Sequence, residues 1–558
     1  MIMTSFLQFA QICQQIESTS GSLDKTDLLA FFLAELAEDE LAIVPSFVMG
    51  SVFPASSEML LGVGPSTLYE ALSKATGCSP SEIVELLRRT GDIGLVAAEV
   101  VEKRKQPTFA TFLGSDQLSV YDVYLRFRNL AQSSGKNSQN VKMKNLQFLF
   151  SESTPLEALY ISRLVLMDMR IGVGEGIVRD AIAKAFHQPV DLVERGYNLS
   201  NDLGLVSKKA KADTLSDITI VLNRPIKMML AQIGGDVSSS LGDMGSTAVE
   251  WKFDGSRVQI HKTGDDVQIY SRRLENVTRS LPEIVDTIKE NIQAESAILD
   301  GEVVAIGEDG RPRAFQEILR RFRRKYKVER LAAKIPLKIF LFDLIYLNGQ
   351  NFIDEPLAKR RAFLEEIADP EIIATQVITN DQNVVDQIYQ DALDAGHEGV
   401  MLKNPNSTYL PGKRGKNWLK IKPVMETLDL VVIGARWGEG RRAKLLGSYR
   451  LACRELETGN MLDVGWVATG ITDDMLAELT NLFADLMVTE AGEGMMVNIR
   501  PEVIFEVAYE EIQKSPNYSS GYALRFPRLV RVRDDKSLDD ADSLDRLTSL
   551  YTSQRGRG

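Results

Sequence analysis

The sequence predicts a multidomain protein with an all-α module over residues 1–215, a mixed α/β (α+β) module over residues 216–422, and a small β-barrel over residues 423–558. Two observations predict this order. The chain has 558 residues, more than one hydrophobic core usually supports at roughly 100–200 residues per domain. Its hydrophobic pattern also changes near residue 216, from a period of about 3.6 residues to short, often alternating runs.

The first module has apolar residues at i, i+3 and i+4, the spacing of one helix face. Three segments show this spacing: 23–41, 67–75 and 80–89. The third opens with Ser79 as the expected N-cap, Pro80 as the first helical residue and Glu82 as the return partner of a capping box. The polar stretch 132–139 predicts a linker between helical halves.

The second and third modules are predicted from short runs rich in β-branched residues. Strands are expected in the second module at 258–261, 267–270, 298–305 and 339–346, and helices at 357–368 and 381–395. After Pro423, further strands are expected at 428–434 and 447–452, and the length that remains suits a small β-barrel.

Charge and composition exclude several classes of protein. The net charge is −12, but basic residues concentrate in 311–330, 413–422 and 525–533, so a local phosphate-binding surface remains compatible with an acidic chain. Three cysteines and three histidines are too few for a four-cysteine zinc site or for histidine-rich metal catalysis. No Gly-x-x-x-x-Gly-Lys-Ser/Thr motif occurs, which disfavours a P-loop nucleotidase.

The sequence has no apolar run of the roughly 18 residues that a membrane span needs. Its N-terminus lacks the basic and apolar regions of a secretory signal. We therefore expect a cytoplasmic enzyme without a membrane partner.

The strongest functional signal is a series of motifs in a fixed order. They are Lys252-Phe-Asp254-Gly-Ser-Arg257, Ser271-Arg272-Arg273, Leu299-Asp-Gly-Glu302, Phe340-Leu-Phe342-Asp343, Glu398-Gly-Val-Met-Leu-Lys403 and Trp418-Leu-Lys420-Ile-Lys422. Their order and spacing resemble the covalent nucleotidyltransferase superfamily of DNA ligases, RNA ligases and mRNA capping enzymes. Over nearly the whole chain, the resemblance is greatest to replicative ATP-dependent DNA ligases of the archaeal and eukaryotic type.

The chemistry of these residue types agrees with the resemblance. A lysine attacks phosphorus only as the neutral amine, and neutrality at pH 7 costs about 4.6 kcal/mol for an ordinary lysine. If the fold brings Lys420 and Lys422 near Lys252, their positive charges favour loss of the proton from Lys252. Carboxylates at Glu302 and Glu398 suit Mg²⁺, a cation that prefers oxygen ligands.

The resemblance implies a role for each motif residue. Lys252 would be the adenylated nucleophile, and Asp254 would orient substrate or metal. The ATP-binding residues would be Glu250 on adenine, Arg257 and Arg272 on ribose or phosphate, Glu302 on ribose or metal, Phe342 stacked on the purine, and Arg414 and Lys420 on the triphosphate. Glu302 and Glu398 would bind Mg²⁺, with Mn²⁺ as the alternative metal.

Two basic segments outside these motifs have expected roles. The stretch from Leu524 to Arg533 resembles the last motif of the family, in an OB-fold barrel whose rotation would bring Arg525 or Arg528 onto pyrophosphate. The alternative interpretation is that the alternating arginines form one solvated face of a strand. The run 320–327 interleaves cations with aromatics, which suits either a DNA backbone contact or a solvated helix face.

Two segments of the helical module point to partners. Met169-Arg-Ile-Gly-Val-Gly-Glu-Gly176 resembles a stretch of the ligase DNA-binding domain, and a glycine-rich entry to a helix exposes N–H groups to phosphate. A tight structural turn is the competing interpretation. The segment from Gln106 to Phe109 loosely resembles a sliding-clamp-binding peptide, although Pro107 departs from the usual form.

The sequence thus predicts a monomeric DNA ligase that uses ATP to seal nicked double-stranded DNA in replication, repair and recombination, through a lysyl-AMP and an adenylated 5′-phosphate. An RNA ligase or a capping enzyme shares the lysine motif, but neither explains the 215-residue helical module. An NAD-dependent ligase is disfavoured, because the four-cysteine zinc site typical of that family cannot be built from three cysteines. The alternative from a different functional class is a non-catalytic scaffold that binds DNA or a sliding clamp. Such a scaffold would be expected to lack Lys252 or the carboxylates.

Overall fold

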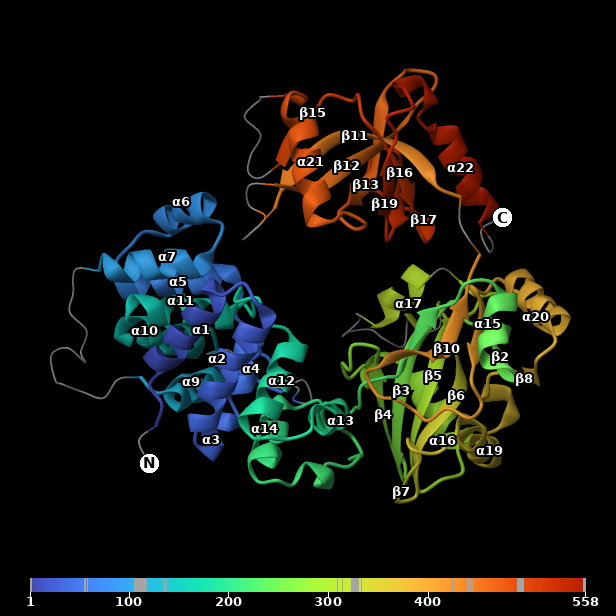
Figure 1. Ribbon diagram of the computed structural model, residues 1–558, viewed down its shortest axis with the longest axis horizontal. Coiled ribbons are helices and arrows are strands. Elements are labelled where there is room, and N and C mark those ends of the chain that lie inside the picture. The colour runs from blue at the N-terminus through green and yellow to red at the C-terminus, as the bar shows by residue number, and fades with distance from the viewer. Residues whose placement is uncertain are drawn as a thin grey trace.

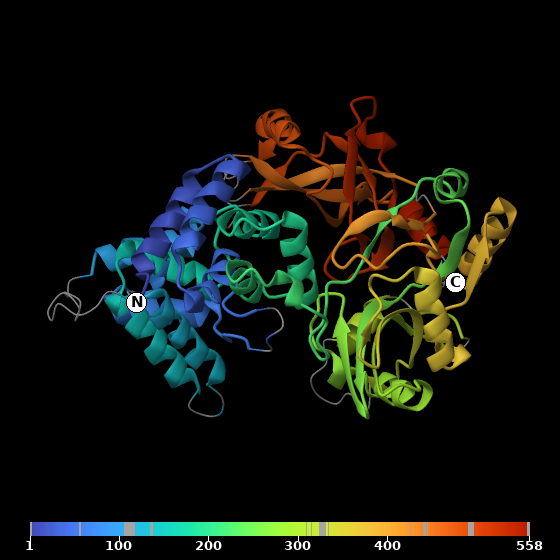
Figure 2. The same cartoon turned by 60° about the horizontal axis from the view of Figure 1, so that its bottom comes forward.

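The computed structural model describes residues 3–554 except 55, 56, 58, 105–117, 134, 136, 137, 309, 314, 323–330, 333, 424, 425, 439–441, 443, 444 and 489–495. The chain forms a helical part, a two-sheet part and a barrel part in that order (Figure 1). In both views the barrel, in orange and red, borders the other two parts (Figures 1 and 2). Among the described residues, no helix combines the length and apolar character that crossing a membrane requires.

The N-terminal part is helical, as predicted, and one large apolar cluster fills its interior. Its helices are α1 (Phe6–Ser18), α2 (Ser22–Glu35), α3 (Glu38–Leu41), α4 (Val44–Val48), α5 (Pro65–Thr76), α6 (Pro80–Thr90), α7 (Ile93–Glu102), α9 (Val120–Gln132), α10 (Ser138–Glu152), α11 (Pro155–Val165), α12 (Glu175–Ala185), α13 (Val190–Ser200), α14 (Leu203–Lys211) and the 3₁₀ turn η1 (Leu215–Asp217).

The single helix expected over 23–41 is wrong, because the chain breaks between α2 and α3. Leu36 is extended and buried, and it ends α2. The Glu40 carboxylate then accepts hydrogen bonds from the Ala37 N–H at 3.1 Å and the Thr4 N–H at 2.6 Å. Burial of Leu36 and this local bonding outweigh the continuous helical spacing of the sequence.

The cap of α6 is confirmed in part. Ser79 is the N-cap, its Oγ accepts from the Glu82 N–H at 3.3 Å, and Pro80 is the first helical residue. The Glu82 carboxylate interacts with the Cys78 thiol, whose pKa is raised to about 11 by burial and by this carboxylate. The second hydrogen bond expected for a capping box, from the Ser79 N–H to the Glu82 carboxylate, is therefore replaced by the contact with Cys78, which lies outside the helix. The stretch 132–139 links α9 to α10, as predicted.

Two five-stranded sheets make the middle of the chain, and every strand and helix predicted there is present. One sheet has the order β1 (Leu230–Ile233), β10 (Arg414–Ile421), β9 (Gly399–Lys403), β2 (Thr247–Lys252) and β8 (Gln376–Thr379). The other has the order β4 (Asp266–Ser271), β3 (Ser256–Thr263), β5 (Ser296–Ala305), β6 (Leu337–Leu347) and β7 (Gln350–Asn351). The helical segments are α15 (Val237–Met244), α16 (Pro282–Asn291), α17 (Phe315–Phe322), α19 (Leu357–Ile367), α20 (Gln382–Asp394), η2 (Thr278–Ser280) and η3 (Pro370–Ile372).

The link from β2 to β3 carries the chain from one sheet to the other. Lys252 ends β2, and Ser256 begins β3 beside β5. Gly255 in this link has no room for a side chain, because a Cβ would lie 2.7 Å from both the Glu302 Cγ and the Val303 carbonyl oxygen. The glycine thus allows the lysine segment to pass directly against the strand that bears Glu302.

The C-terminal part is a β-barrel domain, as predicted. Its main sheet runs β13 (Met461–Val467), β12 (Leu446–Arg454), β11 (Leu428–Trp437), β15 (Met496–Ile499) and β14 (Met487–Val488), and β16 (Ile504–Ala508) joins β11 to β19 (Arg528–Val532). A separate ribbon pairs β17 (Glu511–Lys514) with β18 (Tyr522–Arg525). The helical segments are α21 (Asp473–Ala484), α22 (Leu544–Ser553) and η5 (Leu538–Asp540).

A buried ion pair ties β6 to α19. Both Asp343 and Arg360 are 0% exposed, and the guanidinium donates from Nε at 2.7 Å and from Nη2 at 2.9 Å to the two carboxylate oxygens. Asp343 follows Phe342, so the pair fixes the segment expected to contact the purine.

Because the Arg360 charge is buried, an Asp343→Asn variant is expected to lose about 3–5 kcal/mol of unfolding free energy. Urea denaturation measures this loss. Asp354→Asn is the matched control, since Asp354 meets Arg195 in an exposed bidentate pair at 2.7 and 3.0 Å, worth about 0–1 kcal/mol. Equal losses from the two variants would contradict the role given to the buried pair.

Candidate functional site

The site is organised around Lys252 and two neighbouring charged residues. The Lys252 ammonium is hydrogen-bonded to the Glu398 carboxylate, and Lys422 approaches the same carboxylate at 3.0 Å. The backbone explains this convergence, because Glu398 lies just before β9, whose Gly399 pairs with Lys252 on β2. Burial opposes ionisation of Glu398, but Lys252 and Lys422 together lower its pKa to about 2.

Lys420 belongs to the same cluster of cations. Burial lowers its pKa, and the positive charges of Lys422 and Lys252 lower it further. The sequence argument depended on Lys420 and Lys422 lying near Lys252, and the fold places the three amines close enough for their charges to interact.

Two further carboxyl groups face this cluster. Burial raises the pKa of Glu302 to about 7, while Lys252 and Arg257 act in the opposite direction. Burial and the charges of Glu398 and Glu511 raise the pKa of Asp254 to about 7 as well. Asp254, Glu302 and Glu398 thus influence one another electrostatically beside Lys252, although in the described part of the chain no three such side chains converge as a set of metal ligands.

Arg257 lies between this group and an apolar wall. Its Nη2 donates to the Asp300 carboxylate at 2.6 Å, and Tyr409 donates its hydroxyl to the same oxygen at 2.6 Å. The guanidinium also lies 5.4 Å from the Phe342 ring centroid and 5.5 Å from that of Trp418. Asp300 therefore holds Arg257 in place as a fixed positive charge within the site.

Glu250 and Phe342 meet around a buried lysine. Lys403 is 1% exposed and lies 2.5 Å from the Glu250 carboxylate, to which Gln376 also donates at 2.7 Å. The Lys403 ammonium is 4.4 Å from the Phe342 ring centroid. The two residues expected to recognise the base are thus neighbours, with the Glu250 charge already compensated.

The barrel supplies residues to the same site through its β17–β18 ribbon. Glu510 approaches Lys422 at 3.6 Å, and Arg525 lies 3.3 Å from Glu511. The positive charge of Arg525 offsets part of the rise in the pKa of Asp254. Of the two arginines predicted for this role, Arg525 is therefore the one near the lysine segment, whereas Arg528 is exposed on β19.

Other predicted residues lie outside this group. Arg272 follows β4 and Arg414 begins β10; both side chains are exposed, and among the described residues neither forms a hydrogen bond or ion pair with the charged cluster around Lys252. The proposed DNA contact is wrong for Arg321, which is 0% exposed and donates to the Ile335 and Ser280 carbonyls, each at 3.0 Å. Residues 323–327 and the segment from Gln106 to Phe109 lie outside the described residues.

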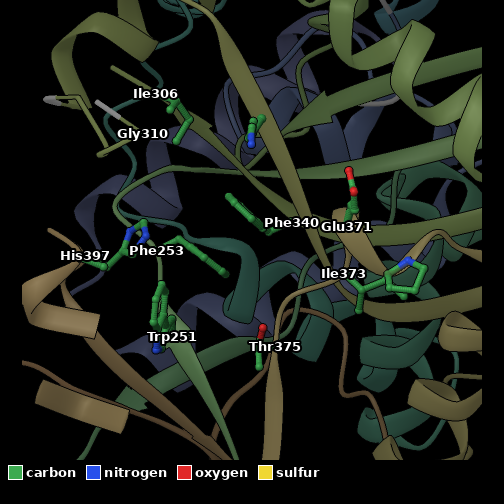
Figure 3. A pocket seen from close by; sticks show the side chains of 12 residues that line it. Trp251, Phe253, Ile306, Gly310, Phe340, Glu371, Ile373, Thr375 and His397 are labelled. Carbon is green, nitrogen blue, oxygen red and sulfur yellow. The ribbon is translucent and has the colours of Figure 1, made fainter. Parts of the chain in front are cut away.

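A cavity of about 300 Å³ lies beside the lysine segment. Trp251 and Phe253, the neighbours of Lys252, line it with His397, and Figure 3 shows these three side chains together. Phe253 stacks on Phe340 with centroids 4.3 Å apart and an interplanar angle of 6°. Burial lowers the pKa of His397 to about 4, so its ring is neutral at pH 7. These aromatic contacts fix the direction of the chain on either side of Lys252.

The site includes residues to which the sequence assigned no role. Asp300 and Lys403 lie within the motifs, and their partners Arg257 and Glu250 were predicted, so a search for compensating charges would have found them. Tyr409 lies in no motif. Its hydroxyl reaches Asp300 only because the chain after β9 folds back over the second sheet.

Family models and known proteins match almost the whole chain. Three family models match: "DNA ligase N terminus" at residues 5–183, "ATP dependent DNA ligase domain" at 228–422 and "ATP dependent DNA ligase C terminal region" at 442–536. A "DNA ligase" of Methanothrix thermoacetophila is 63% identical over 555 residues, and a "DNA ligase 2" of Methanosarcina acetivorans is 54% identical over 569; each match covers 100% of both chains. A solved structure described as "Pmar-Lig_PreS3" has a TM-score of 0.56 at 18% identity and covers 94% of this chain and 99% of the other, which shows a shared fold.

Proposed function

Since the chain belongs to the family of ATP-dependent DNA ligases, we propose that Lys252 is the residue that carries AMP while the enzyme seals nicks in DNA. The family reaction forms a phosphodiester bond through a covalent enzyme–adenylate. The observation that supports Lys252 is its place in the charge cluster, where it shares Glu398 with Lys422 and lies near Lys420. The neutral amine of a lysine is the form that attacks phosphorus.

The surrounding residues have distinct roles in this proposal. The Lys252 amine attacks the α-phosphorus of ATP, a phosphorus–nitrogen bond forms, and pyrophosphate leaves. Glu250 and Phe342 bind the adenine, while Arg257 and Arg272 bind ribose or phosphate. Lys420, Arg414 and Arg525 neutralise the triphosphate. AMP then passes to the 5′-phosphate of the nick, and the 3′-hydroxyl displaces it.

We also propose Mg²⁺ as the cofactor, with Mn²⁺ as the alternative. Glu302 and Glu398 would hold it, since their charges act on one another within the site and their carboxylates offer the oxygen ligands that the ion prefers. When bound, the ion neutralises negative charge on the phosphoryl oxygens.

We also propose a role for each part of the chain and a partner for two of its segments. Residues 1–215 form the DNA-binding domain, 216–422 the adenylation domain and 423–558 the OB-fold domain. The turn from Met169 to Gly176 contacts the DNA backbone, because it leads into α12 through glycines. The enzyme acts as a monomer, and Gln106–Phe109 binds a sliding clamp, a proposal that rests on the sequence pattern.

A donor assay tests the function directly. ATP, GTP, ADP and NAD⁺ are supplied separately with Mg²⁺ to the enzyme on nicked DNA and nicked RNA duplexes. We expect sealing with ATP on DNA at least about tenfold faster than with GTP, because Glu250 recognises adenine. Efficient sealing of RNA nicks alone, or equal use of GTP, would contradict the proposal.

A further inference from the structure

A buried lysine in the helical part holds the turn that precedes α12. Lys25 is 2% exposed and lies in the first turn of α2. Its Nζ donates to the Ile171 carbonyl at 2.6 Å and to the Gly172 carbonyl at 3.3 Å. One ammonium group therefore binds two successive carbonyls of the glycine-rich segment.

The position of Lys25 is unfavourable for α2 itself. A cation in the first turn of a helix lies near the positive end of the helix dipole, and burial of an ammonium is costly without acceptors. The hydrogen bonds to the two carbonyls offset part of both costs. These two hydrogen bonds stabilise the turn after Met169 rather than α2 itself.

A second buried cation acts on the same turn. Arg163 is 3% exposed, and its Nη1 donates to the Met169 carbonyl at 3.0 Å. Its guanidinium is fixed by Glu17 at 2.7 Å and Asp92 at 2.6 Å. Three carbonyls, those of Met169, Ile171 and Gly172, therefore point toward buried cations.

The geometry of the peptide bond then sets the direction of the N–H groups. In a trans peptide unit the C=O and the following N–H point in opposite directions. The N–H groups of Arg170, Gly172 and Val173 consequently point away from the interior. In the described part of the chain, those of Gly172 and Val173 donate to no backbone carbonyl, and Gly172 is exposed. Arg170 and Gly172 have φ of 57° and 66°, so the turn is held in a left-handed conformation.

We propose that Lys25 is a positioning residue for DNA binding: it holds the carbonyls of Ile171 and Gly172 inward, so that the N–H groups of this turn face the phosphate backbone. The proposal rests on the proposed contact between this turn and DNA. Backbone N–H groups bind phosphate oxygens without reading the base sequence, which suits an enzyme that seals any nick.

The test compares full-length Lys25→Met with Lys262→Met. Lys262 is the matched control, since it is 7% exposed and its Nζ donates to the Gly264 carbonyl at 2.9 Å and the Ala294 carbonyl at 2.7 Å, far from the turn in sequence. We expect Lys25→Met to raise the Kd for nicked duplex DNA about tenfold and to leave the rate of lysyl-AMP formation without DNA unchanged. Lys262→Met should leave the Kd unchanged, and Lys25→Arg, which can still donate to both carbonyls, should recover most of the affinity.

An Arg170→Ala variant separates the positioning role of Lys25 from the proposed contact between the turn and DNA. If Arg170→Ala weakens DNA binding while Lys25→Met does not, the positioning role is wrong but the contact between the turn and DNA stands. If neither variant changes the Kd, the contact itself is wrong. Should Lys25→Met fold poorly, Lys25→Gln is measured in the same assays, and wild-type DNA affinity in that variant overturns the positioning role.

Discussion

A Lys252→Ala enzyme takes up no label from α-³²P-ATP and seals no nick, because the amine that forms the phosphorus–nitrogen bond is gone. The expected loss is on the order of 10⁶-fold, as for removal of other covalent nucleophiles. Radioactive gels measure labelling, and denaturing electrophoresis of a nicked duplex measures sealing.

Lys416→Ala is the matched control for this variant. Lys416 lies on β10 with Lys420, but its side chain is 79% exposed and its nearest acid, Asp243, is 3.9 Å away. This control should label and seal within about threefold of the wild type, as for a surface change of less than about 0.5 kcal/mol. Labelling retained by Lys252→Ala would mean that another residue carries the nucleotide.

A Glu398→Gln enzyme is expected to show the second largest effect. The change keeps the size of the side chain but removes the charge that Lys252 and Lys422 share, together with a proposed ligand of Mg²⁺. We expect lysyl-AMP formation to fall roughly 10²–10³-fold, the size typical for loss of one electrostatic group that acts in the transition state. Single-turnover labelling at saturating ATP measures this rate.

Glu510→Gln is the control, since Glu510 also faces Lys422 but comes from the barrel and lies 3.6 Å away. The control should lose less than about tenfold. The direction of the Glu398 effect is informative, because this carboxylate also forms an ion pair with the attacking amine of Lys252. If Glu398→Gln labels faster than the wild type at pH 7, the ion pair with Glu398 mainly restrains the Lys252 amine, and the proposed role of Glu398 in catalysis is wrong.

The sequence predicted the architecture well because each part has its own hydrophobic period. Runs such as 258–261 and 339–346 are short and contain β-branched residues, as is typical of strands, and they form parts of β3 and β6. The failure at 23–41 has a local cause. The helical spacing continues through Leu36, but Glu40 supplies a competing partner for the backbone at Ala37.

The site was predicted less completely, since motifs identify residues but not their partners. The meeting of Lys252, Glu398 and Lys422 follows from the pairing of β2, β9 and β10, which the order of motifs alone does not establish. Charge runs are also ambiguous, as Arg321 shows. It lies in a basic stretch, but its guanidinium is buried and bound to backbone carbonyls.

The central claim is that Lys252 is the residue that carries AMP, and peptide mapping tests it most directly. The enzyme is incubated with ATP and Mg²⁺, digested under conditions that preserve the phosphorus–nitrogen bond, and analysed by tandem mass spectrometry. We predict the added mass of one AMP on the peptide that contains Glu250 to Arg257, with fragment ions that place it on Lys252. AMP on Lys420, Lys422 or any other residue would contradict this account of the site.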